Sequence, residues 1–243
     1  MDLSPEEFAA QARAVASRAA ALIQPGMRLG LGSGRMATAF VEALRPRVDA
    51  GLRVSGLCTS RATEDLAREV GIGLLDSSEG ELDLDVDGAD EYDESLNLLK
   101  GGGGALLREK VVAQRSRRFW VLADASKRVH RLGSSRALPI EVLSYDWSGT
   151  AALCESRLGG RAERRPPGAE PFISDNGNFV LDLHLPRGLD EPKSAAGQLA
   201  GIAGVLGHGL FLGLATAVMV VEDGEVKVLG DLERHRPTPP TGA

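Results

Sequence analysis

The sequence predicts an α/β fold in two parts, on three observations. Strand-like and helix-like segments alternate between residues 27 and 123, and glycine-rich or acidic stretches directly follow the strand-like ones. From about Gly133, prolines and glycine pairs break the chain into shorter pieces. Such alternation is typical of βαβ units in a mostly parallel sheet. We therefore expect a Rossmann-like domain formed by 1–132 and 208–236, a second, smaller α+β domain at 133–207, and a disordered tail at 237–243.

The first helix has a clear start signal. Ser4 can cap the helix, Pro5 suits the first helical position, and Glu7 closes a capping box with Ser4. The helix should run to about Gln24, because the Pro-Gly pair that follows stops it.

Strands and helices then alternate in a regular order. Pro46 is expected to end the second helix, and Gly71 to cap the third. The expected strands are 27–31, 52–58, 83–87 and 119–123, and the expected helices are 36–44, 62–70 and 105–113.

The second half of the chain predicts hairpins. Asp175-Asn176-Gly177-Asn178 is a turn between strand-like segments of 172–185, since Asn-Gly accepts the positive φ that such turns need. The apolar run 205–221 is too short and too glycine-rich for a membrane helix and is predicted to form two buried strands. Segments 218–221 and 226–229, joined by Asp223-Gly224, should form a last hairpin that returns to the main sheet.

The composition excludes several classes of function. With 43% hydrophobic residues and a net charge of −6, the chain is expected to be soluble and to bind neither nucleic acid nor membrane. The acidic N-terminus is unlike a signal peptide. We therefore expect a cytoplasmic location. Cys58 and Cys154 are expected to be buried free thiols, and the four scattered histidines predict no metal site.

The stretch GLGSGRMATAF at 30–40 is a glycine-rich turn between a strand and a helix, a place that favours an anion. Its glycines also fit a dinucleotide motif, which would require an acidic residue at the end of the next strand. Cys58-Thr59-Ser60 stand there instead, so NAD is disfavoured and a bare phosphate fits better. Alternatively, the glycines only allow close packing of strand and helix.

Two acidic residues follow the strand at 83–87. Asp87 and Asp90, on either side of Gly88, could coordinate magnesium or share acid-base work. The alternative is a turn in which both carboxylates bind local backbone.

Lys100 and four glycines come next, followed by Glu109 in the predicted helix. The lysine precedes the glycines, which excludes a P-loop, and four glycines are costly unless a ligand approaches the backbone closely. Glu109 either faces this glycine loop or is a solvated helical residue. Together these features favour a site for a phosphorylated, polyhydroxylated small molecule.

Close to its full length the chain resembles the ribose-5-phosphate isomerases of the A type. The segments that carry the resemblance are VDGADEYDESLNLLKGGGGALLREKVVA, ADASKRVHRLG, QPGMRLGLGSG and SDNGNFVLDLH. The resemblance implies a metal-independent enzyme without a cofactor, usually oligomeric and here expected to be a homodimer. Its substrate would be a small sugar phosphate. It would interconvert ribose 5-phosphate and ribulose 5-phosphate through an enediolate, in the non-oxidative branch of the pentose phosphate pathway.

The resemblance also implies roles for individual residues. Glu109 would be the general base, Asp87 and Asp90 would bind sugar hydroxyls and assist ring opening, and Lys100 would stabilise negative charge on the substrate oxygen. The remaining positions implied to bind the substrate are Ser33, Gly34, Arg35, Met36, Gly88, Ala89, Gly101, Gly102, Gly103 and Lys127.

The chain departs from the family in its first loop, which usually reads GTGST. Arg35 and Met36 replace two hydroxyl residues here, and Arg35 could either bind the phosphate or project into solvent. A lysine that many members carry in the first helix falls at or beside Ala12, next to Arg13. Two alternatives therefore stay open: an isomerase for a different sugar phosphate, and a non-catalytic sugar-phosphate sensor.

Overall fold

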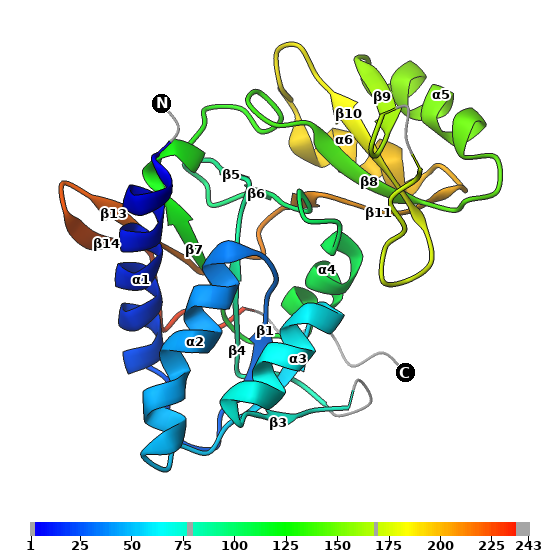
Figure 1. Cartoon of the computed structure of the whole chain (residues 1–243). Coiled ribbons are helices and arrows are strands. Elements are labelled where there is room, and N and C mark those ends of the chain that lie inside the picture. Colours follow the sequence, from blue (N-terminus) through cyan, green and yellow to red (C-terminus); the bar gives the residue numbers. More distant parts are fainter. Residues whose placement is uncertain (1–2, 77–79, 168–169, 237–243) are drawn as a thin grey trace. The chain divides into compact units, whose positions relative to one another are not determined.

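The computed structural model describes residues 3–76, 80–167 and 170–236 (Figure 1). The chain forms two compact units. Unit 1 contains the described residues up to Gly88, Glu109–Lys127 and those from Gly213 onward, and unit 2 contains Ala89–Arg108 and Arg128–Leu212. The sequence placed 89–108 in the larger domain, whereas these residues pair within unit 2. The predicted tail at 237–243 lies outside the described residues.

Helix α1 (Pro5–Ala21) in unit 1 begins as its sequence predicts. The Ser4 hydroxyl accepts a hydrogen bond from the Glu7 amide at 3.2 Å, and the Ser4 amide donates to the Glu7 carboxylate at 2.9 Å. The helix ends before the expected Gln24. The amides of Leu22 and Ile23 donate to the carbonyls of Ala19 and Ala20, three residues back, instead of continuing the α-helical pattern.

Unit 1 is built on a seven-stranded sheet of the described residues, which confirms the predicted fold class. The strand order is β14-β13-β7-β4-β1-β2-β3, and all neighbours are parallel except β13 and β14. Asp223 and Gly224 form the tight turn between those two, with φ of 53° and 79°, so the predicted last hairpin does return to the main sheet. The strands are β1 (Arg28–Leu31), β2 (Ser55–Cys58), β3 (Gly73–Leu74), β4 (Leu84–Gly88), β7 (Phe119–Asp124), β13 (Ala217–Glu222) and β14 (Glu225–Gly230).

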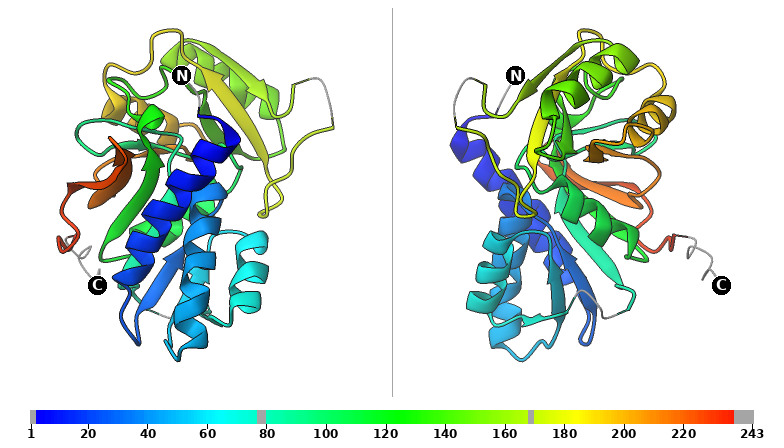
Figure 2. Two further views of the ribbon diagram at one scale, coloured as in Figure 1. Left: turned by 60° about the vertical axis from the view of Figure 1, so that its left-hand side comes forward. Right: turned by 90° about the vertical axis from the view of Figure 1, so that its right-hand side faces the viewer.

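Helices cover both faces of this sheet (Figures 1 and 2). Helices α1, α2 (Arg35–Asp49) and α3 (Arg61–Val70) share one core with Leu29 and Leu31 of β1. Gly30 points to the other face, where a Cβ at this position would lie 2.5 Å from Val112 of α4 (Leu106–Gln114). Helix α4 begins in unit 2 and enters unit 1 at Glu109.

Pro46 does not end α2 as predicted, because the helix continues to Asp49. A proline removes one helical donor, here the partner of the Glu42 carbonyl. Both residues are exposed, so water can satisfy that carbonyl. Gly71, by contrast, caps α3 as predicted, with φ of 87°.

Unit 2 has a four-stranded antiparallel sheet among its described residues, in the order β11-β8-β10-β9. Helices α5 (Trp147–Leu158) and α6 (Pro192–Ala200) contribute to the same core as β8 and β10. A small second sheet has the order β12-β6-β5. The strands are β5 (Glu91–Tyr92), β6 (Leu98–Leu99), β8 (Leu138–Val142), β9 (Arg161–Arg164), β10 (Phe179–His184), β11 (Val205–His208) and β12 (Leu210–Phe211).

Two details in the second half of the chain correct the sequence prediction. The run 205–221 holds three strands rather than two, and its first strand is not fully buried. Gly209 breaks the run, because its amide donates to the Pro139 carbonyl and its carbonyl accepts the Lys100 amide. The turn at Asp175–Asn178 is confirmed by the bond from the Ser174 amide to the Asn178 carbonyl, but only a single bridge precedes it where a strand was expected.

Candidate active site

The carboxyl ends of β1 and β4 lie where the strand order reverses, the place at which open α/β sheets typically bind ligands. From β1 the chain goes to β2 on one side, whereas β4 lies on the other side of β1. The Gly32 amide donates to the Val86 carbonyl at 3.0 Å, and the Ser33 amide donates to Asp87 Oδ1 at 3.0 Å. The predicted phosphate loop and the first predicted aspartate are therefore adjacent in unit 1.

Asp87 is fully buried at the end of β4. Besides the Ser33 amide, its Oδ1 accepts the Gly88 amide at 2.7 Å. A Cβ on Gly32 would lie 2.1 Å from Asp87 Cγ, a separation that no side chain tolerates. Gly32 is thus a glycine because the aspartate side chain occupies the space beside it.

The side chains of the phosphate loop, defined as Ser33–Met36, have different surroundings. The Ser33 hydroxyl lies 2.6 Å from the Thr59 hydroxyl, and Met36 is buried in the core. The Arg35 guanidinium stacks 3.9 Å from the centre of the Phe8 ring on α1. The Gly34 N-cap offers no side-chain cap to α2, so the loop presents backbone amides and one guanidinium.

Lys127 ends a short 3-10 turn, Ala125–Lys127, that follows β7. The turn is held by the buried carboxylate of Asp124, which accepts the Ser126 amide at 3.0 Å. Lys127 is half-buried. In the described part of the chain its amine makes no ion pair with another candidate residue, so its predicted ligand contact stays a prediction.

In unit 2 the second aspartate is tied to the glycine loop, defined as Gly101–Gly104. Asp90, which follows Ala89, accepts the Gly102 amide on Oδ2 at 2.7 Å. A Cβ on Gly102 would lie 2.8 Å from Asp90 Oδ1, so this position also requires glycine. The structure therefore brings Asp90 and the predicted backbone donors together.

Lys100 immediately precedes the glycine loop and is 3% exposed. Its amide donates to the Gly209 carbonyl at 2.9 Å, and its amine lies 5.6 Å from the centre of the Phe211 ring. Both contacts fix a cation beside the glycine loop in a place shielded from water.

Glu109 lies in the first turn of α4 and is only 4% exposed, so the alternative of a solvated helical residue is wrong. Lys110, its neighbour, is partly buried, and burial lowers the pKa of its amine from 10.5 to about 8.

Sequence reasoning missed two buried carboxylates in unit 2. Glu91 accepts the amides of Gly133, Ser135 and Arg136 and the Ser135 hydroxyl. Glu141 accepts the Ser174 hydroxyl and the side-chain amides of Asn176 and Asn178. A charged residue within the apolar strand Leu138–Val142 was the available signal for Glu141. These hydrogen bonds to neighbouring loops give both acids a role in holding loops.

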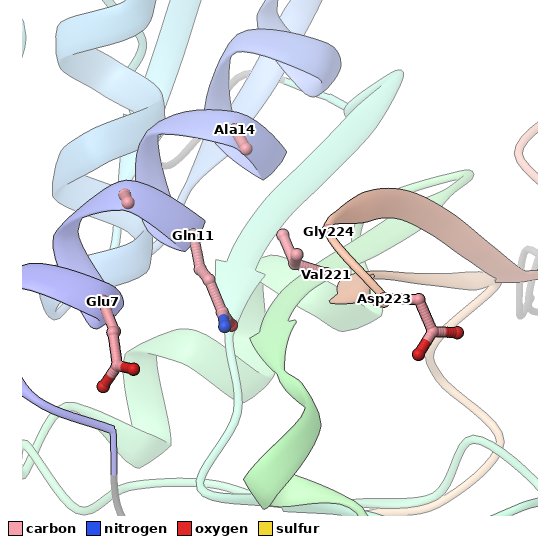
Figure 3. Close-up of a pocket in the computed structure, with 7 residues that line it drawn as sticks. Glu7, Gln11, Ala14, Val221, Asp223 and Gly224 are labelled. Carbon is pink, nitrogen blue, oxygen red and sulfur yellow. The ribbon is translucent and has the colours of Figure 1, made fainter.

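A separate pocket of about 360 Å³ lies between α1 and the β13–β14 hairpin of unit 1 (Figure 3). None of the candidate residues lines it; its lining is Glu7, Ala10, Gln11, Ala14, Val221, Asp223 and Gly224. The described residues contain no cluster of three or more His, Cys, Asp or Glu side chains suited to a metal ion. None of their helices is long and apolar enough to span a membrane.

Comparison with known proteins gives a consistent result. Residues 55–225 match the family of ribose 5-phosphate isomerase A (phosphoriboisomerase A). The ribose-5-phosphate isomerase A of Ruegeria sp. (strain TM1040) is 45% identical over 237 residues, covering 93% of this chain and 88% of that protein. A solved ribose 5-phosphate isomerase from Plasmodium falciparum has a TM-score of 0.87 and 31% identity, covering 90% of this chain and 97% of that one.

A further solved structure, a D-ribose-5-phosphate isomerase in complex with phospho-erythronic acid, has a TM-score of 0.87 and 34% identity. The match covers 94% of this chain and 100% of that one. The chain therefore belongs to the ribose 5-phosphate isomerase A family.

Proposed function

We propose that Glu109, Asp87, Asp90 and Lys100 carry out the reaction of this chain, the interconversion of ribose 5-phosphate and ribulose 5-phosphate. The activity follows from membership of the family. The assignment of roles is supported above all by the burial of Glu109, because a carboxylate shielded from water at a helix start is unusual unless it has a task.

The reaction needs a base and an electrophile. Glu109 removes the proton from C2 of the open-chain aldose, and the electrons move onto the carbonyl oxygen at C1 to give an enediolate. The Lys100 amine and the backbone of Gly101–Gly103 donate to the oxygen that becomes negative. The hydroxyl proton of O2 passes to O1, and Glu109 returns the other proton to C1 as the carbonyl forms at C2, which yields the ketose. Electrons balance within the substrate, so no redox partner enters.

The two aspartates hold the sugar. Asp87 and Asp90 accept hydrogen bonds from its hydroxyls and assist ring opening. Gly88 and Ala89, between them, allow the sugar to approach the backbone. The amides that each aspartate already accepts, at 3.0 Å from Ser33 and 2.7 Å from Gly102, support this assignment because they fix the carboxylates before the substrate arrives.

The phosphate is assigned to Ser33–Met36, with Lys127 as a further ligand-binding cation. The Ser33 hydroxyl is engaged with Thr59, the Ser33 amide is engaged with Asp87, and the Met36 side chain is buried. The Arg35 guanidinium and the backbone amides of residues 34–36 are therefore the groups that remain for an anion. Stacking on Phe8 occupies one face of the guanidinium and leaves its N–H edges available.

The test is formation of ribulose 5-phosphate by the purified chain in the presence of a chelator. Glu109→Gln should lower kcat by about 10²- to 10⁴-fold, the usual contribution of a general base. Glu69→Gln, which changes an exposed partner of Arg45, is the matched control and should leave kcat unchanged. Equal turnover by the wild type and Glu109→Gln would exclude Glu109 as the base.

A second candidate substrate class is favoured by the loop itself. Arg35 and Met36 stand where the family usually has hydroxyls, which supports an isomerase for another sugar phosphate. Comparison of kcat/KM across pentose and hexose phosphates decides between them. Assembly as a homodimer and a cytoplasmic location also remain proposals; light scattering of the purified chain tests the first, and fractionation of the source cells tests the second.

A further inference from the structure

The guanidinium of Arg165 links the core sheet of unit 2 to the glycine loop. Its Nε donates to Asp182 Oδ2 at 2.7 Å, and its Nη2 donates to the other oxygen of that carboxylate. Its Nη1 donates to two carbonyls of the loop, Gly101 at 3.1 Å and Gly102 at 2.9 Å. One side chain thus bridges a carboxylate and two successive peptide groups.

Both ends of this bridge are held by regular structure. Arg165 directly follows β9, and its amide donates to the Val180 carbonyl of β10 at 2.9 Å. Asp182 lies on β10 itself. The two side chains are only 17% and 22% exposed. A planar guanidinium gripped by a carboxylate on a strand has one orientation, so its remaining N–H groups point in fixed directions.

Peptide planarity passes this orientation to the other side of the loop. In a trans peptide the C=O and the next N–H point in opposite directions. The Gly101 carbonyl faces Arg165, and the Gly102 amide accordingly points away, to Asp90 at 2.7 Å. The Gly102 carbonyl also faces Arg165, so the Gly103 amide points away from it as well. That amide has no acceptor within the described residues.

We propose that Arg165, fixed by Asp182, is a positioning residue that orients the Gly103 amide and the Gly102–Asp90 contact for the reaction. This inference rests on the proposed function, in which the backbone of Gly101–Gly103 receives negative charge from the substrate oxygen. Adjacent glycines are otherwise free to take many conformations, and donors that must reorient during the reaction stabilise charge poorly. The cation also polarises the two peptide groups, which strengthens their N–H donors.

The first measurement separates kcat from KM. Arg165→Met should lower kcat by about 10- to 100-fold, somewhat less than loss of a direct oxyanion donor, while KM changes by less than about threefold. Arg165→Lys should be intermediate, because an amine keeps the charge but cannot bind Asp182 and two carbonyls at once. Asp182→Asn should act in the same direction. The control is Arg131→Met, which removes an exposed ion pair with Asp190 in the same unit.

The second measurement is one that a merely structural role would not change. Phospho-erythronic acid, found in a relative, carries a carboxylate where the enediolate would be charged, whereas ribitol 5-phosphate carries only hydroxyls there. In calorimetry, Arg165→Met should weaken binding of the acid by about tenfold or more and that of the polyol by less than about twofold. General loosening of the unit would weaken both ligands equally.

Each outcome decides the matter. Unchanged kcat in Arg165→Met, or equal loss of affinity for the acid and the polyol, overturns the positioning role. If that variant does not unfold cooperatively, Arg165→Lys and Asp182→Asn decide instead, and wild-type behaviour of both overturns the proposal. A wild-type chain that neither isomerises ribose 5-phosphate nor binds either ligand overturns the proposed function itself, and this inference with it.

Discussion

Asp87 and Ser33 lie 54 residues apart in the chain, yet the carboxylate of one accepts the amide of the other at 3.0 Å. The contact exists because the strands that precede them, β4 and β1, are parallel neighbours. It joins the loop assigned to the phosphate to the carboxylate assigned to the sugar, so distance between these two groups is set by the main sheet rather than by flexible side chains.

Gly32→Ala should disrupt this contact. Its Cβ would lie 2.1 Å from Asp87 Cγ, so the aspartate or the loop must shift. We expect a loss of about 1–3 kcal/mol in the free energy of unfolding, as for overpacked cores, and a fall in kcat/KM of at least about tenfold. Denaturant unfolding and steady-state kinetics measure both. Gly197→Ala, in α6 with no atom near its added methyl group, is the control and should be neutral or stabilising.

Two neighbouring glycines of the glycine loop should respond differently to alanine. Gly102→Ala would place its Cβ 2.8 Å from Asp90 Oδ1, whereas Gly103→Ala meets no atom within 4 Å. Gly102→Ala should therefore lower both melting temperature and kcat, and Gly103→Ala should leave the melting temperature unchanged. Loss of activity in a normally stable Gly103→Ala would then report close approach of the substrate. Equal melting temperatures for the two variants would contradict the described geometry.

Arg35→Met should raise KM for ribose 5-phosphate with little change in kcat. A charge-assisted contact with phosphate contributes about 1.5–3 kcal/mol, which corresponds to roughly a 10- to 100-fold change in KM. Phe8→Leu should produce part of the same effect, because the ring supports the guanidinium at 3.9 Å. Arg45→Met, on the same helix with an exposed partner, serves as control. An unchanged KM in Arg35→Met would show that Arg35 does not contact the phosphate.

The two cysteines should resist alkylation in the folded protein. Burial raises the pKa of Cys58 from 9.0 to about 12 and that of Cys154 to about 11. Their reactive thiolates are therefore about a thousandfold and a hundredfold rarer than in an ordinary thiol. Iodoacetamide at pH 8, followed by mass spectrometry, should label neither residue until denaturant is added. Rapid labelling of the native chain would contradict the buried positions.

Lys110 should make stability depend on alkaline pH. Its pKa is lowered from 10.5 to about 8, so the unfolded chain binds more protons between these values and stability rises with pH across that window. Lys110→Met should be more stable than wild type at pH 7, by about 1–2 kcal/mol, and the advantage should shrink towards pH 10.5. The measurement is urea unfolding at several pH values.

Lys227→Met is a control for which the pH dependence of stability should have the opposite sign. Its ion pair with Asp223 raises the pKa of Lys227, so any stabilisation is present below pH 10.5 and disappears above it. An advantage of Lys110→Met that does not change with pH would contradict the lowered pKa.

Local signals predicted much of the fold. The Ser4 capping box, the Gly71 cap and the Asp223-Gly224 turn act over a few residues, and all three are found as expected. The errors have non-local causes. Pro46 is tolerated because its helix face is exposed, and the run 205–221 is split because Gly209 bonds two distant segments. Neither fact can be read from neighbouring residues.

The candidate site was predictable to a similar extent. Motif and resemblance singled out Asp87, Asp90 and Glu109 as candidates, and their roles stay predictions; the burial of Glu109 could not be told from its charged neighbours. Arg165 escaped notice because its stretch resembles a simple chain break. Its importance depends on Asp182 and on the glycine loop, which lie 17 and about 64 residues away in sequence.

The interleaved course of the chain has a consequence for biosynthesis. Unit 2 is complete once Leu212 has been synthesised, whereas unit 1 still lacks β13 and β14 at that point. Until β13 emerges, β7 is the edge of the main sheet, with an apolar and fully buried sequence that has no partner on that side. Such an edge can pair with another nascent chain. Pairing of the last hairpin with β7 therefore removes this edge from contact with other chains.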